Sequence, residues 1–164
     1  MRKFKDYPEF TPNMTPKECI RAGIFGGCYF NPIGGKPGIL TKRIKIDHTE
    51  FPESWFKGVN ENKYLSRRYD PDINKYKVAS GQDQAAWERN GWIKKQDPRG
   101  WFQWYCRFYI GRRTDDDERQ IKRWLGVAGP NGRFLRQYRN NKDSLKLKQT
   151  LLHWAWSVEK KKKK

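Results

Sequence analysis

Residues 97–111 read Asp97-Pro-Arg-Gly-Trp-Phe-Gln-Trp-Tyr-Cys-Arg-Phe-Tyr-Ile-Gly111. On a helix, four of the aromatic rings share one face, because their spacing is i, i+3, i+4, i+7; these are Trp101, Trp104, Tyr105 and Phe108. Phe102, Cys106 and Tyr109 cover most of the remaining surface, which leaves only a narrow polar strip at Gln103 and Arg107. A helix that is apolar nearly all round must be packed on several sides. The stretch therefore predicts a central core helix.

The same rings allow a second interpretation, in which they form a platform for stacking nucleic-acid bases. Rings with that role are usually few and exposed, whereas those of residues 101–109 point in every direction around the helix. We therefore favour the core interpretation for this segment.

The whole chain shows the same dependence on aromatic residues. Its 164 residues include 8 Trp, 8 Tyr and 9 Phe, which together outnumber leucine, isoleucine and valine. So little aliphatic content with a high charge borders on the composition of disordered chains. Because each buried aromatic side chain removes roughly 150–250 Å² from water, a core built on rings is still feasible. The composition favours a folded, basic domain.

Local signals place further elements on both sides of residues 97–111. Thr15-Pro16-Lys17-Glu18 has the pattern of a capping box, with proline in the first turn, and predicts a short helix. Residues 52–56 predict one helical turn, residues 80–83 a helix start with its end at Asn90-Gly91, and Ser144 the start of a C-terminal helix. In the C-terminal helix Lys146, Gln149 and His153 lie opposite the apolar stripe, so His153 is expected at the surface. Residues 39–46 alternate apolar and basic side chains at Ile44 and Ile46 and predict one short strand.

These elements predict a mainly α fold with possibly one short β element. We expect a single compact, aromatic-rich domain over residues 1–159, irregular and rich in Gly and Pro over 1–79 and helical over 80–159. Residues 160–164 are all lysine and are expected to form a disordered tail.

Several classes of protein are disfavoured. No apolar run approaches the roughly 20 residues of a membrane span, so no membrane partner is expected. The start lacks a secretory signal, and three cysteines, Cys19, Cys28 and Cys106, cannot all pair, which favours a reducing intracellular compartment. With only His48 and His153 beside these thiols, we expect no metal site and no cofactor.

Positive charge is concentrated in one segment. The chain carries 36 Lys and Arg against 18 Asp and Glu, a formal charge of +18, and residues 119–148 hold only one acid, Asp143. Two consecutive amphipathic helices are expected in this segment, each with an apolar and a basic side. The first has Ile121, Trp124 and Leu125 opposite Arg119, Lys122 and Arg123; the second has Phe134, Leu135 and Tyr138 opposite Arg133, Arg136 and Arg139.

Between these helices lies the turn Gly126-Val-Ala-Gly129-Pro-Asn-Gly132. It resembles the hairpin of the helix-hairpin-helix family, with one residue too many between its first two glycines. The resemblance implies contact with a DNA backbone through N–H groups from Gly129 to Gly132. An ordinary turn between helices is the alternative.

An active site is harder to find. Thr114 is expected to cap a helix whose first turn holds Asp115, Asp116, Asp117 and Glu118. These acids could bind Mg²⁺ only with ligands from elsewhere, such as Asp47, Glu50, Asp70 or Asp72, so we favour their role in complementing the helix dipole. Cys106 is expected to be buried and inert. Arg99, Arg107, Arg112 and Arg113 either pair with the acidic run or face an anionic substrate.

One longer resemblance spans most of residues 23–135. The run Asp97 to Arg113, followed by Asp116-Asp-Glu-Arg-Gln-Ile-Lys-Arg-Trp124, resembles a family of uncharacterised proteins, and Gly26-Gly-Cys-Tyr-Phe30 and Lys36-Pro-Gly-Ile-Leu40 add to the likeness. It implies a common fold. Because no activity is attached to that family, it assigns no functional residue.

The sequence thus predicts a nucleic-acid-binding protein that contacts the phosphate backbone without strong sequence specificity. DNA is the more expected partner, and a nuclear or nucleoprotein-associated location is expected. The expected contacts are Arg119, Lys122, Arg123, Gly129, Gly132, Arg133, Arg136, Arg139, Lys146 and Lys148. Two alternatives stay open: an enzyme acting on nucleic acid, such as a nuclease or base-processing enzyme with a pocket around Arg99, Arg107, Arg112 and residues 115–118, and a structural protein of a nucleoprotein particle.

Overall fold

Helix α3 (Trp101–Tyr109) lies among the other elements with nearly all of its side chains buried. Trp104, Tyr105 and Phe108 have no measurable exposure, and even Gln103 is completely buried. The ring of Phe10 fills the space beside them, with centroid distances of 5.6 Å to Trp104, 5.7 Å to Tyr105 and 5.6 Å to Phe108. The prediction of a central aromatic helix is confirmed.

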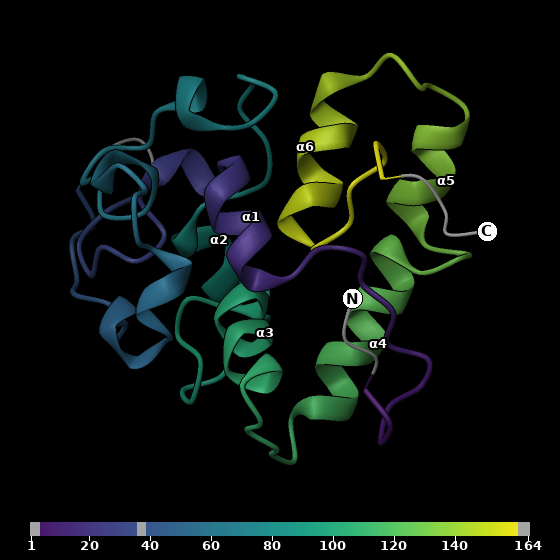
Figure 1. Cartoon of the computed structure of the whole chain (residues 1–164), viewed down its shortest axis with the longest axis horizontal. Coiled ribbons are helices and arrows are strands. Elements are labelled where there is room, and N and C mark those ends of the chain that lie inside the picture. Colours follow the sequence, from purple (N-terminus) through teal and green to yellow (C-terminus); the bar gives the residue numbers. More distant parts are fainter. Residues whose placement is uncertain (1–3, 36–38, 161–164) are drawn as a thin grey trace.

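The computed structural model describes residues 4–35 and 39–160. Its fold is mostly helical, aromatic-rich and compact, with much irregular chain. The other α-helices are α1 (Pro16–Ala22), α2 (Gln84–Arg89), α4 (Asp117–Ala128), α5 (Arg133–Arg139) and α6 (Leu145–His153). Short 3-10 turns, η1 to η5, cover Phe25–Gly27, His48–Glu50, Glu53–Trp55, Glu61–Lys63 and Pro71–Ile73. Figure 1 shows the irregular chain that follows α1 on one side of α1 and α3, and α4 to α6 grouped on the other, with the segment before α1 beside α4.

The starts of α1, α2 and α6 follow the caps that the sequence predicts. Thr15 and Glu18 form the reciprocal capping box of α1, with N–O distances of 3.1 and 3.0 Å. Asp83 caps α2 and Ser144 caps α6 through their side-chain oxygens. The cap predicted at Thr114 is wrong, because helix α4 begins at Asp117 with Asp116 at its N-cap position and no side-chain cap bond. The backbone N–H of Thr114 instead donates to the Asp117 carboxylate at 2.9 Å.

The strand predicted for residues 39–46 is wrong for the part that the structure describes. Ile44 and Ile46 are buried while Arg43 and Lys45 are exposed, so the alternation is present. However, the backbone N–H of Ile44 donates to the carbonyl of Pro32 at 2.7 Å, and no neighbouring chain provides a ladder. An isolated bridge joins Ile39 to Gly34 instead. Lys36, Pro37 and Gly38 lie outside the described residues.

Helix α6 differs from its predicted amphipathic pattern. Gln149 is completely buried and His153 is 6% exposed, although both lie opposite the apolar stripe. The Gln149 amide donates to the carbonyl of Gly23 at 3.2 Å, and the His153 ring stacks on Phe25 at 4.3 Å. The expectation of a surface histidine is wrong because the irregular N-terminal chain packs against the polar side of this helix.

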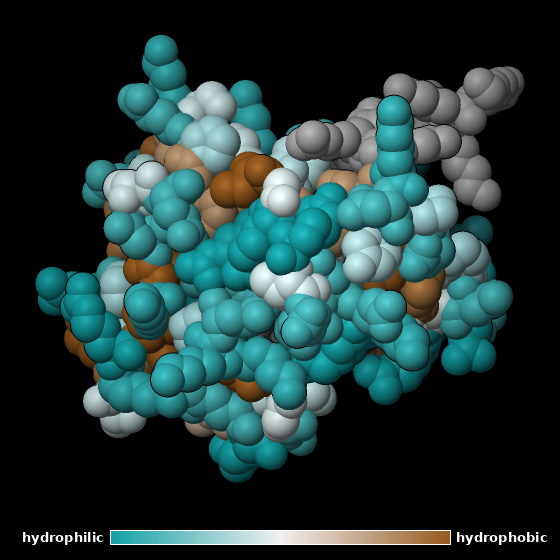
Figure 2. All heavy atoms as spheres, turned by 90° about the horizontal axis from the view of Figure 1, so that it is seen from below, coloured by the Kyte–Doolittle hydropathy of each residue, from teal (hydrophilic) through white to brown (hydrophobic). Residues whose placement is uncertain are grey.

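Two remaining expectations concern the ends of the chain and the membrane. Lys160 pairs with Glu18 at 2.7 Å, so the first residue of the expected tail contacts α1; residues 161–164 lie outside the described part. Among the helices that the structure describes, none has the length and apolarity to cross a membrane. Figure 2 shows a face on which hydrophilic residues predominate and apolar ones form only small patches.

Candidate nucleic-acid interface and an adjoining cavity

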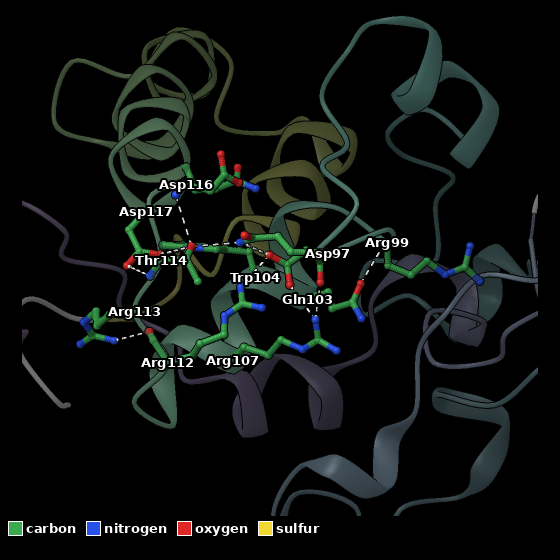
Figure 3. Close-up of polar contacts among 12 residues, drawn as sticks. Asp97, Arg99, Gln103, Trp104, Arg107, Arg112, Arg113, Thr114, Asp116 and Asp117 are labelled. Atoms are coloured by element: carbon green, nitrogen blue, oxygen red, sulfur yellow. Dashed lines mark hydrogen bonds and ion pairs between the residues drawn. The ribbon is translucent and has the colours of Figure 1, made fainter.

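Asp97 organises a buried ionic cluster at the start of α3 (Figure 3). Its carboxylate is completely buried and accepts from Arg107 at 3.0 Å and from Arg112 at 2.6 Å. Arg107 also pairs with Glu50 at 2.9 Å, and these carboxylates raise the pKa of its guanidinium against the opposing effect of burial. The positive charges of these two arginines are therefore balanced within the fold.

The acidic run that precedes α4 is tied to its own surroundings. Asp116 holds Arg119 through two hydrogen bonds of 2.6 and 2.9 Å. Asp117 is 1% exposed and accepts the indole N–H of Trp104 at 2.8 Å. In the described part of the chain, no three His, Cys, Asp or Glu side chains are grouped as metal ligands would be. The structure therefore gives the two central acids structural contacts.

Arg99 lies apart from this cluster, and its side chain points away from Asp97 in Figure 3. It is 3% exposed. Its guanidinium donates to backbone carbonyls of Tyr29 at 2.9 Å and Asn31 at 2.9 Å, and also to those of Cys28 and Gly34. Burial lowers the pKa of Arg99, and no described carboxylate pairs with it. The predicted pocket that combines Arg99, Arg107, Arg112 and residues 115–118 is therefore not formed.

The predicted basic side chains of α4 to α6 are distributed as follows. Lys122, Arg133, Arg136 and Arg139 are exposed, whereas Arg119 and Arg123 are half-buried. The apolar sides of the helices face inward as predicted, with Ile121, Trp124 and Leu135 buried. We call the set of eight basic side chains the basic surface: Arg119, Lys122, Arg123, Arg133, Arg136, Arg139, Lys146 and Lys148.

Most of this basic surface forms no ion pair with the residues that the structure describes. Within residues 4–35 and 39–160, Arg119 is the member that forms an ion pair, with Asp116. Arg139 donates to the carbonyl of Pro130 at 3.0 Å, and the Lys148 ammonium lies 5.8 Å from the centroid of the Tyr76 ring. Carbonyls and rings accept these cations without neutralising them. The charge remains available for an external anion.

The glycine turn between α4 and α5 uses its N–H groups internally. Gly129 donates to Trp124 at 3.2 Å, and Gly132 donates to Gly129 at 2.8 Å. A Cβ atom at Gly132 would lie 2.5 Å from the carbonyl carbon and oxygen of Val127, so close backbone packing requires glycine there. The two predicted glycine donors are thus engaged within the turn, and the interface proposed below rests on side chains.

A cavity of about 820 Å³ lies between α4 to α6 and the rest of the molecule. Three members of the basic surface line it: Arg123, Arg133 and Lys146. Arg99 and His153 add further basic groups, and none of the described side chains that line the cavity is acidic. The aromatic lining consists of Phe25, Tyr29, Trp87, Trp92, Trp101, Phe102, Phe134 and Trp154.

Arg123 occupies the aromatic wall of this cavity. Its guanidinium carbon lies 5.7 Å from the centroid of the Trp92 ring and 5.3 Å from that of Trp154. It donates to Gln120 at 2.9 Å and to the carbonyl of Trp92 at 3.3 Å. Burial, with a smaller contribution from Arg119, lowers its pKa to about 10. Because neutral pH lies below this pKa, Arg123 stays protonated there and is a partly desolvated cation.

No protein-family model, curated protein or solved structure matches this chain. Its function is therefore argued from the chemistry of the site alone.

The sequence does not predict the cavity. Its charge pattern predicts Arg123, Arg133 and Lys146 as contacts, but the aromatic stacking that it suggests is confined to residues 97–111. Trp87 and Trp92 flank a predicted helix end, and Trp154 follows a helix, so no shared periodicity connects them. The one signal in the sequence is local: tryptophans near the ends of predicted helices, in a chain that also has a segment with excess positive charge.

Proposed function

We propose that this protein binds nucleic acid by contacting the phosphate backbone through the basic surface. The observation that carries the proposal is the difference between two groups of cations. Arg107 and Arg112 are paired with a buried carboxylate, whereas the basic surface beyond Arg119 has no ion pair in the described structure. A polyanion would supply the missing counter-charge and gain entropy by releasing its own counterions.

The density of charge supports the same proposal. Residues 119–148 contain nine Lys and Arg and one acid, so 9 − 1 gives a net charge of +8 in this segment. Such an excess makes a compact structure repel itself. A regular array of phosphates relieves that repulsion without base contacts, so we propose backbone-directed binding with little sequence specificity, and DNA as the first polyanion to test.

The carboxylates favour a binding protein over the alternative of a nuclease. Metal-dependent nucleases gather carboxylates in a cleft that also holds the phosphate. Here Asp97, Asp116 and Asp117 contact arginines or a tryptophan, and the lining of the cavity described above is not acidic. The acids thus support the core rather than the surface proposed for nucleic acid.

The experiment that tests the proposal is a binding titration with a fluorescent DNA duplex at several salt concentrations. The logarithm of the affinity should fall linearly with the logarithm of the salt concentration, with a slope of about −0.9 per phosphate contacted. A salt-independent affinity would contradict backbone contact.

A charge-reversal variant locates the site. Replacing Arg133, Arg136 and Arg139 by Glu should abolish binding, because it turns three exposed cations of α5 into anions. The matched control replaces Lys17, Arg43 and Lys57 by Glu. These cations are exposed, lie in the N-terminal part and give the same change in net charge. The control should bind more weakly only through the loss of overall charge; equal loss in both variants would show that the site is not on α5. Circular dichroism should show the native fold in both.

A further inference from the structure

The cavity beside the basic surface has a charge pattern that calls for an anionic ligand. Arg123, Arg133 and Lys146 belong to both the cavity and the surface, so the two are continuous. Arg99 is buried and satisfied by carbonyl dipoles, with no carboxylate partner among the described residues. Buried cations are normally paired with an opposite charge. An anion that enters this cavity would provide the opposite charge that Arg99 lacks.

The aromatic lining of the cavity favours a planar group on the same ligand. Trp87, Trp92 and Trp154 are partly exposed, so part of each ring is not packed against the core. Trp154 packs against Trp101 at a centroid distance of 4.9 Å, and Arg123 lies near both Trp92 and Trp154. Rings and a guanidinium together form the kind of surface on which nucleobases stack.

Hydrogen-bond donors and acceptors are both present for the edge of a base. Gln82 and Gln137 line the cavity with amides that both donate and accept. The volume of about 820 Å³ lies within the range of small-molecule sites and buries a ligand on several sides. A base that is still paired within a duplex cannot reach walls on several sides.

We propose that this cavity receives one unpaired nucleotide, with its base among the tryptophans and its phosphate on Arg123, Arg133 and Lys146. The proposal rests on the nucleic-acid binding proposed above and specifies the ligand class: single-stranded nucleic acid, or a nucleotide displaced from a duplex. A free nucleotide shares this chemistry, and the test separates the two sources.

The first test compares ligands on the full, unmodified chain by tryptophan fluorescence and calorimetry. AMP should bind at least tenfold more tightly than adenosine or inorganic phosphate, because only AMP uses both the rings and the cations. A single-stranded oligonucleotide should bind more tightly than a strand of the same length in which every base is absent, although both carry the same phosphates. It should also bind more tightly than the matching duplex.

The second test uses two variants and one control. Arg123→Gln removes a cation from the cavity and should weaken AMP binding about tenfold, equivalent to about 1.4 kcal/mol. Trp92→Leu keeps an apolar side chain but removes a ring and should weaken AMP and the oligonucleotide while sparing inorganic phosphate. Arg43→Gln removes an exposed cation outside the cavity and should leave AMP binding unchanged. Thermal melts check that each variant is folded.

The outcomes separate this inference from the proposed function. Binding of duplex, intact strand and abasic strand with equal affinity, together with no AMP binding, overturns the inference and leaves backbone contact in place. Binding of AMP without any polynucleotide binding supports the cavity as a nucleotide site and overturns the proposed function and the polynucleotide source. Absence of binding to AMP and to every polynucleotide overturns both.

Discussion

Arg99 and Arg112 are held near the start of α3 by different chemistry. Arg112 shares the carboxylate of Asp97 with Arg107, yet its Nε atom is buried without a hydrogen-bond partner in the described structure. Arg99 instead donates to a set of backbone carbonyls and to Gln84. The charge of Arg112 is thus balanced locally, whereas that of Arg99 is only solvated by dipoles. This difference is why Arg99 belongs with the ligand cavity and Arg112 with the scaffold.

Replacing Asp97 by Asn should destabilise the protein by about 3 kcal/mol, because removing one partner of a buried pair leaves the other charges uncompensated. The carboxylate is completely buried and contacts two arginines. Urea unfolding monitored by circular dichroism measures the change. The matched control is Asp6→Asn, which breaks an exposed pair with Arg113 and should cost less than about 1 kcal/mol. Equal costs would mean that the buried cluster contributes no more than a surface pair.

At the level of elements, two indole N–H groups join α3 to α4. Trp104 donates to the buried carboxylate of Asp117 at 2.8 Å, and Trp101 donates to the backbone carbonyl of Gln120 at 3.1 Å. Both bonds cross between the same two helices, so they form a natural comparison. A bond to a charged acceptor is worth about 1.5–3 kcal/mol, against about 0.5–1.5 for a neutral one.

Trp104→Phe should therefore destabilise the protein by about 1 kcal/mol more than Trp101→Phe. Each substitution removes one indole N–H and the same number of ring atoms from a buried site, with exposed fractions of 0% and 5%. Thermal and urea unfolding give the difference. If Trp101→Phe proves equally destabilising, the contact with Asp117 carries no additional energy and the packing of the indole rings dominates.

Elements with local signals were predictable from the sequence. The capping box at Thr15, the cap at Ser144 and the aromatic surface of α3 each depend on residues within one or two turns. Predictions failed where distant chain decides the environment. Residues 39–46 have the alternation of a strand but lack a partner, and His153 is buried because Phe25 from the irregular part stacks on it.

The candidate site divides in the same way. The basic positions of α4 and α5 follow from helical periodicity, so Arg123 and Arg133 could be chosen from sequence. The cavity could not, because Trp87, Trp92 and Trp154 come from three segments whose meeting depends on tertiary packing. The ion pairs were also not predictable from the sequence. It does not show that Asp97 pairs with Arg107 and Arg112 and not with Arg99.

At the scale of the whole molecule, charge and core are arranged as two connected systems. Paired arginines surround α3 and hold the irregular N-terminal chain to the helices, as Arg107 does with Glu50. The basic surface lies on α4 to α6, where Arg119 is the member with an ion pair in the described structure, and three of its members line the cavity. The same separation that stabilises the core therefore leaves a positive surface, and the repulsion within that surface is relieved when an anion binds.

The buried thiols and phenols make the stability of the whole molecule sensitive to alkaline pH. Burial raises the pKa of Cys19 and Cys106 above the ordinary value of 9.0, and that of Tyr29 and Tyr105 above 10.0. A group with a raised pKa in the folded state contributes stability that is fully present below its unfolded pKa. That stability is lost as pH rises, since the unfolded chain ionises and the folded chain does not.

We therefore expect the free energy of unfolding to be nearly constant from pH 6 to 8 and to fall by about 3 kcal/mol by pH 10, from the two cysteines alone. Arg123 acts in the opposite direction, because its pKa is lowered to about 10, but it does so only above that pH. Urea midpoints at pH 7, 9 and 10 measure the loss. The control with Cys19 and Cys106 replaced by Ala should be less stable at pH 7 and show a shallower decline. A decline of the same steepness in this control would assign the alkaline sensitivity to groups other than these thiols.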